Sequence, residues 1–142
     1  WSFTSIIPSD ISTIDAPDNQ FSTQRALGHL KKISKQPHYL GSDAHVEVRD
    51  YILKNLEDLG LQTQTQEAYS IDEDGEFTKP IIILGRLKGS ENGKALLLLT
   101  HYDSDPHSSF GASDAGSGVV TILEGLRAYI SENKTPKKDP KK

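Results

Sequence analysis

Apolar residues recur with helical spacing in two segments near the start of the chain. A first helix is predicted between residues 21 and 34, where they recur every three or four positions. A second, longer helix is predicted from Ser42 or Asp43 to Gly60, because serine and aspartate cap helix starts and glycine commonly follows helix ends. Its expected buried stripe consists of Val46, Val48, Ile52, Leu53, Leu56 and Leu59.

Three later segments have the composition of β-strands. Residues 61–70 alternate in the manner of a half-exposed strand, and residues 79–87 carry four apolar residues at their centre. Residues 94–100 contain an unbroken leucine run, which predicts a strand buried on both faces. The acidic turn 71–76 lacks the spaced oxygen ligands of a calcium loop and is interpreted as a hairpin turn. Asn-Gly within residues 88–93 predicts a second hairpin.

The stretch from Ala95 to Ile130 organises the chain, because a strand, a polar loop and a helix follow one another in it. His101 and Asp103 come where the predicted strand ends, which is where ligand sites gather in α/β sheets. Asp114 comes near the start of the next helix, which is expected to end near Asn133.

Imidazole and carboxylate groups together suit zinc and similar divalent ions. His101 and Asp103 are two residues apart, so on an extended backbone they point to the same side and one can orient the other. Asp114 could return to the same point or could simply cap a helix. We interpret Asp105 and His107 as solvated loop residues.

Composition narrows the possible functions. The 142 residues suffice for one ordinary domain, and a net charge of −4 with both signs mixed gives no reason to expect nucleic-acid binding. The absence of cysteine excludes disulfides and thiolate zinc sites. No apolar run approaches the roughly 20 residues needed to span a bilayer. Residues 1–20 are polar and interrupted by proline, which predicts an extended lead-in, and residues 133–142 form a basic tail predicted to be disordered.

The segment THYDSDPHSSFGASDAGSGVVTILE resembles the first metal-binding block of the M28 family of zinc aminopeptidases. Residues 21–61 are similar to the N-terminal helices of its vacuolar-membrane and endoplasmic-reticulum branch. The resemblance implies an incomplete three-layer α/β/α zinc-peptidase fold, a mixed sheet with helices on both faces, of which about three strands and three helices are present. Residues 21–132 would be the N-terminal part of that domain.

The resemblance also implies roles for individual residues. His101 would bind one zinc, Asp114 would bridge two zincs, and Asp103 would be the catalytic residue that orients His101. A cis peptide bond is expected between Asp114 and Ala115, although many relatives carry Asp or Asn where this chain has Ala115. The Pro-His-x-x-Gly-Ser turn at His38 binds no metal in the family, so this histidine is expected to be packed or hydrogen-bonded.

Three of the five protein ligands that the family implies, and its Glu-Glu general base, have no candidate in this sequence. Because a catalytic zinc usually needs three protein ligands, we expect weak or no zinc binding and little activity from this chain alone. An exposed apolar sheet edge would remain, so self-association is expected.

The resemblance therefore implies a two-zinc aminopeptidase acting on peptides or proteins, on the non-cytoplasmic side of a membrane and with any anchor outside this chain. Two alternatives stay open. One is a peptidase-like binding domain without catalysis. The other is a small self-sufficient α/β domain whose aspartate-rich loop is incidental, which would be indifferent to zinc.

Overall fold

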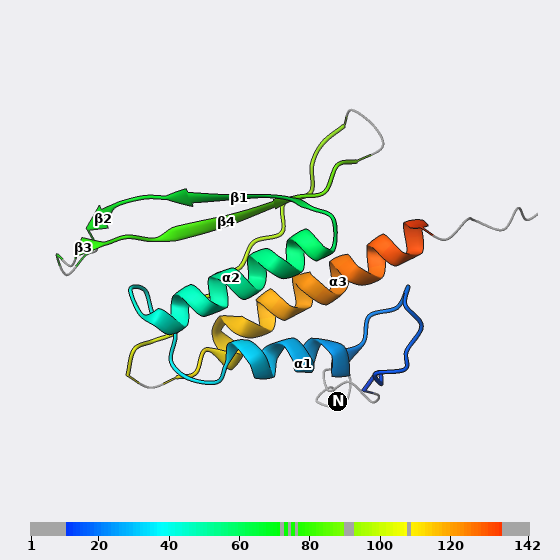
Figure 1. Ribbon diagram of the computed structural model, residues 1–142, viewed down its shortest axis with the longest axis horizontal. Helices are drawn as coiled ribbons and strands as arrows, with labels where there is room; N and C mark the ends of the chain where they lie inside the picture. Colours follow the sequence, from blue (N-terminus) through cyan, green and yellow to red (C-terminus); the bar gives the residue numbers. More distant parts are fainter. Residues whose placement is uncertain are drawn as a thin grey trace, which may run out of the picture.

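The computed structural model describes residues 11–71, 73, 75, 77–89, 93–107 and 109–134. Within these residues the chain forms three α-helices, four short strands and one π-helical turn (Figure 1). The first half of the predicted lead-in, residues 1–10, and the predicted basic tail from residue 135 lie outside the described residues.

The first two helices have the predicted positions. Helix α1 spans Thr23–Ile33, and the Ser22 hydroxyl caps it by accepting a hydrogen bond from the Arg25 N–H. Helix α2 spans Asp43–Asp58 and begins in the same way, with the Ser42 hydroxyl accepting from the His45 N–H. Gly60 follows α2 with a φ of +86°, a left-handed conformation that glycine adopts without steric cost.

The third helix, α3, spans Ser117–Lys134 and directly follows the π-helical turn η1, Ala112–Gly116. Helix α1 packs against α3, while α2 packs against the strands β1 (Gln62–Glu67) and β4 (Ile81–Arg86). One apolar core joins the three helices. Its buried members are Ala26, Ile33, Val48, Ile52, Leu56, Leu61, Val119, Val120 and Leu123.

The strands form a long antiparallel ribbon. β1 pairs with β4, with Gln62 opposite Arg86 and Glu67 opposite Ile81. The ribbon continues into β2 (Ser70–Ile71) and β3 (Phe77–Thr78), which pair on either side of the acidic turn. The hairpin interpretation is thus confirmed at its two arms, although residues 72, 74 and 76 of the turn lie outside the described residues.

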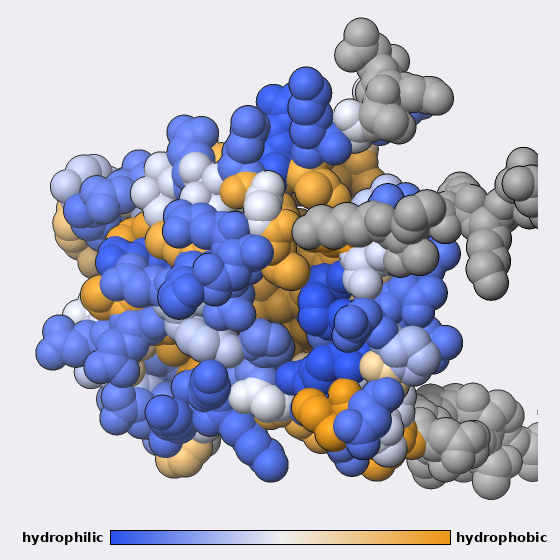
Figure 2. Space-filling view, turned by 45° about the vertical axis from the view of Figure 1, so that its right-hand side comes forward, coloured by the Kyte–Doolittle hydropathy of each residue, from blue (hydrophilic) through white to orange (hydrophobic). Residues whose placement is uncertain are grey.

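The third predicted strand is wrong for the described part of the chain. Residues 94–100 are neither paired with β4 nor assigned to any strand, and Leu96, Leu97 and Leu99 are 77–85% exposed. An extended apolar segment is buried only where other elements cover it, and no described strand lies beside this one. The second predicted hairpin consequently has no paired arms, and residues 90–92 of its loop are not described. Exposed apolar residues are visible in Figure 2 as orange patches among hydrophilic side chains.

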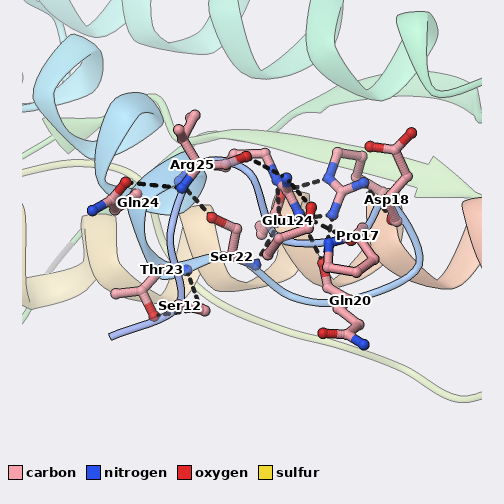
Figure 3. Close-up of polar contacts among 12 residues, drawn as sticks. Ser12, Pro17, Asp18, Gln20, Ser22, Thr23, Gln24, Arg25 and Glu124 are labelled. Atoms are coloured by element: carbon pink, nitrogen blue, oxygen red, sulfur yellow. Dashed lines mark hydrogen bonds and ion pairs between the residues drawn. The ribbon is translucent and has the colours of Figure 1, made fainter. Parts of the chain in front are cut away.

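Residues 11–20 form no helix or strand but are fixed to α1 and α3 by arginine side chains. Arg25 donates to the carbonyls of Ile14 and Ala16, at 2.8 Å each, and Arg127 donates to the carbonyl of Gln20 at 2.8 Å. Figure 3 shows Pro17, Asp18 and Gln20 of the coil beside Arg25 of α1 and Glu124 of α3. The second half of the predicted lead-in is therefore bound to the helices by hydrogen bonds.

Glu124 on α3 lies at the centre of this arrangement and is 0% exposed. Its carboxylate accepts hydrogen bonds from the Ser22 N–H at 2.8 Å, from Arg25 Nε at 3.0 Å and from Arg127 Nε at 2.7 Å. Burial opposes ionisation of this group, but the hydrogen bonds from Arg127, Ser22 and Arg25 hold the pKa of Glu124 below its ordinary value. The buried charge is thus paired on two sides and links the start of α1 to the middle of α3.

Candidate metal centre

In the polar loop after residue 100, burial increases from the exposed His101 through the half-buried Tyr102 and Asp103 to the buried Ser104. His101 is exposed, and its neighbour Tyr102 turns toward the interior. The Tyr102 hydroxyl donates to the carbonyl of Ile81 at 2.9 Å, and its ring stacks on His45 of α2 with centroids 4.6 Å apart. Burial raises the pKa of Tyr102 to about 12, so the hydroxyl keeps its proton at neutral pH.

Ser104 is the second inward side chain of the loop and is 5% exposed. Its hydroxyl accepts a hydrogen bond from the His38 N–H at 2.7 Å, and its own N–H donates to the His38 carbonyl at 3.3 Å. His38 is 1% exposed, so the expectation of a packed and hydrogen-bonded histidine is confirmed. Tyr102 and Ser104 together fasten the loop to strand β4, helix α2 and the turn before α2.

Asp114 lies in the turn η1, which is closed by a hydrogen bond between two backbone groups. The Gly116 N–H donates to the Gly111 carbonyl at 2.8 Å, and Gly111 has a φ of +65°. The Asp114–Ala115 peptide bond is cis, as predicted. The Thr100 hydroxyl donates to the Ala115 carbonyl at 3.5 Å, so the turn also contacts the end of the segment that precedes the loop.

These elements bring the three candidate residues together. His101 Nδ1 lies 3.0 Å from Asp103 Oδ1, and His101 Nε2 lies 2.8 Å from Asp114 Oδ1. Partial burial opposes protonation, but hydrogen bonds to Asp114 and Asp103 raise the pKa of His101 above 6.5. Both carboxylates accept hydrogen bonds, so each ring nitrogen carries a proton when both contacts are made.

The donor set fits zinc. One imidazole nitrogen already has a carboxylate partner, which is the arrangement that commonly orients metal-binding histidines. The other nitrogen faces a second carboxylate, whose side chain is 88% exposed. Two ligands of one tetrahedral zinc lie about 3.3 Å apart, given bond lengths near 2.0–2.2 Å. His101 Nε2 and Asp114 Oδ1 are 2.8 Å apart, so they need to move only slightly further apart to bind an ion in place of the proton between them.

The remaining loop candidates do not join this cluster. Asp105 and His107 are exposed, and the His107 N–H donates to Asp105 Oδ1 at 2.7 Å. Across the described part of the chain, no three His, Cys, Asp or Glu side chains converge as a metal site with three ligands. The residues that sequence reasoning missed are Tyr102, Ser104 and His45. The alternation that pairs His101 with Asp103 could have identified the first two, because it places the intervening residues on the buried side.

Comparison with solved structures defines the fold class. A glutaminyl cyclase from Porphyromonas gingivalis superposes with a TM-score of 0.72 at 26% identity, covering 87% of this chain and 42% of that chain. A Zn-dependent exopeptidase from Parabacteroides distasonis superposes with a TM-score of 0.69 at 29% identity, covering 82% of this chain and 43% of that chain. The predicted class, an incomplete α/β zinc-peptidase fold, is confirmed.

Sequence comparison then gives the family. Residues 83–139 match the family model of peptidase family M28. A vacuolar membrane protease from Candida tropicalis is 31% identical over 89% of this chain, which spans only 15% of the length of that protein. The resemblance to peptidase family M28 is thereby confirmed, and the chain contains part of an M28-type domain. In the described residues, no helix is both long enough and apolar enough to cross a bilayer.

Proposed function

We propose that this chain is part of a zinc-dependent exopeptidase of the aminopeptidase type, with a two-zinc site. His101 would bind one zinc through Nε2, Asp114 would bridge the two ions, and Asp103 would orient His101. The observation that carries the proposal is the position of the His101 ring between the two carboxylates, at 3.0 and 2.8 Å.

The chemistry follows from what each residue presents. Asp103 holds a proton on Nδ1, so that Nε2 is left as the metal-binding atom when its own proton is lost. Asp114 exposes most of its carboxylate, which leaves its oxygens accessible to two ions. When bound, zinc polarises a scissile carbonyl and lowers the pKa of a bound water. The general base and the other ligands that the family implies would come from outside this chain.

The finer features of the parent protein are part of the same proposal. The substrate would be a peptide or protein, because the matched family is a peptidase family and the relatives are named proteases. The relatives are named vacuolar membrane proteases, which favours a catalytic domain on the lumenal side of a membrane and an anchor elsewhere in the protein. This chain alone would have little or no activity, since it supplies fewer than the usual three ligands of a catalytic zinc.

Zinc titration by calorimetry tests the assignment. We expect weak binding by this chain, which His101→Ala abolishes and His107→Ala preserves, because His107 lies in the same loop but outside the cluster. Equal binding in both variants would refute the role of His101. The same titration and a peptide-hydrolysis assay on the longer protein test the activity. A longer protein that binds peptides without cleaving them would support the binding-domain alternative.

A further inference from the structure

His38, Ser104 and Gly111 form a buried cluster next to the site, called the buried joint below. This cluster contacts both halves of the site. One half is the loop with His101 and Asp103, which continues directly into Ser104. The other half is the turn η1 with Asp114, which is closed by the hydrogen bond from the Gly116 N–H to the Gly111 carbonyl. Ser104 and Gly111 are buried, so each half of the site has a buried residue on this side.

The His38 imidazole packs against both of these points, which also lie next to each other. A Cβ atom placed on Gly111 would lie 2.8 Å from His38 Cε1, 3.0 Å from His38 Nε2 and 3.0 Å from Ser104 Cβ. These three residues are thus in direct contact, and the ring edge that carries Cε1 and Nε2 faces the glycine.

The orientation of the ring is fixed from its other side. His38 Nδ1 lies 3.1 Å from the Gln36 carbonyl, which can only accept, so Nδ1 carries a proton and donates to it. The backbone of His38 exchanges two hydrogen bonds with Ser104. The ring therefore cannot turn away from Gly111 without losing its bond to Gln36.

We propose that His38 is a positioning residue of the candidate metal centre. Its imidazole acts as a spacer that sets the separation between the segment carrying His101 and Asp103 and the turn carrying Asp114. The functional meaning of this spacing rests on the proposed zinc chemistry, whereas the packing itself exists without metal. Since the His101–Asp114 contact spans the same two segments, a change in the spacer shifts that contact.

Two substitutions separate the two ends of the ring. His38→Asn keeps a side-chain N–H near the position of Nδ1, where it can still donate to Gln36, but removes the atoms that face Gly111. His38→Gln extends further and places its amide near the position of Nε2, which preserves the spacer. His29→Asn is the matched control, because His29 also bonds through Nδ1, to the Tyr51 hydroxyl at 2.6 Å, but lies on α1 outside the joint.

The first readout needs no metal. The ¹⁵N resonances of the His101 ring, measured at one fixed pH, report its two contacts with Asp103 and Asp114. We expect His38→Asn to shift them, and His38→Gln and His29→Asn to leave them close to the wild-type positions. Ser104→Ala removes the hydroxyl that accepts from the His38 N–H and tests the joint with a smaller change, in case His38→Asn does not fold. We expect it to shift the same resonances.

The second readout is zinc affinity. Loss of a residue that orients a metal ligand from outside the ligand set typically costs 10–100-fold in affinity, and we expect a loss of about that size for His38→Asn. Unchanged His101 resonances in folded His38→Asn, or in Ser104→Ala where His38→Asn does not fold, would overturn the spacer role. Absence of zinc binding by the wild-type chain and by the longer protein would instead overturn the proposed function, while the resonances would still decide the role of His38.

Discussion

Replacing Glu124 by glutamine should lower the free energy of unfolding more than the same replacement of an exposed glutamate on α3. The substitution keeps the shape of the side chain but removes its charge. One oxygen becomes an NH₂ group, which then faces guanidinium N–H groups that also donate. Arg25 and Arg127 would keep their backbone carbonyl partners, but they would lose the carboxylate that compensates their charge.

The expected loss follows from the contacts. Hydrogen bonds to charged groups contribute roughly 1.5–3 kcal/mol each, and removing one partner of a buried ion pair costs about 3–5 kcal/mol. The arginine side chains retain 16% and 23% exposure, and glutamine still accepts some of the bonds. We therefore expect the free energy of unfolding to fall by about 2–4 kcal/mol. For a chain of this size, a loss near 3 kcal/mol lowers Tm by roughly 6–12 °C.

Urea denaturation followed by circular dichroism at pH 7 measures the loss, with Glu132→Gln as the matched control. Glu132 is exposed on the same helix and accepts a hydrogen bond from Asn19. The pKa of Glu124 is lowered in the folded chain, so its stabilising effect is present above the ordinary glutamate pKa and is lost as the pH falls through the lowered value. The difference in the free energy of unfolding between wild type and Glu124→Gln should therefore become smaller as the pH is lowered. Equal stabilities of the two variants at pH 7 would refute the reasoning.

Three further predictions concern the turn and the site. Gly116→Ala should lower the free energy of unfolding by about 1–3 kcal/mol, because its Cβ would lie 2.6 Å from a backbone oxygen. Gly125→Ala, where a Cβ meets nothing within 4 Å, should leave this free energy unchanged or raise it by up to about 1 kcal/mol, and chemical denaturation compares the two variants. Tyr102→Phe should cost about 0.5–1.5 kcal/mol in the same assay, since it loses its hydrogen bond to β4. The pKa of His101 is raised by its two carboxylates, so zinc affinity should increase as the pH rises through that value, and calorimetry in buffers of different ionisation enthalpy should detect proton release.

The helices could be predicted because their signals are local. The position of Ser42 at the start of α2 follows from capping chemistry, which depends on a few neighbouring residues. The same holds for the pairing of His101 with Asp103, since an extended backbone places residues two apart on one side. That Asp114 lies beside them could not be derived from spacing alone, and the family resemblance supplied it.

The buried charges could not be predicted in the same way, because they depend on contacts between distant segments. Glu124 and Arg25 are separated by 99 positions in the sequence. One local signal was present. Glu124 lies four residues after Val120, so it falls on the apolar stripe of α3, where an ionised group needs partners. For the leucine run at residues 96–99, the local pattern predicted burial, but the leucines are exposed. Burial of an extended segment depends on other elements that cover it, and the local pattern does not contain them.

The same dependence explains why the site is ordered although its key residues are exposed. The His101 side chain is 54% exposed, and its two hydrogen bonds are to Asp103 and Asp114, whose side chains are 40% and 88% exposed. Its geometry is set by Tyr102 and Ser104, which alternate with the candidate residues and point into the interior. The Tyr102 ring stacks on His45 of α2, and Ser104 is hydrogen-bonded to His38 in the turn before α2. Both histidines are buried. The chemistry of the loop therefore depends on buried side chains one or two steps removed from it, so variants of these residues should alter the site without changing any residue that would contact zinc.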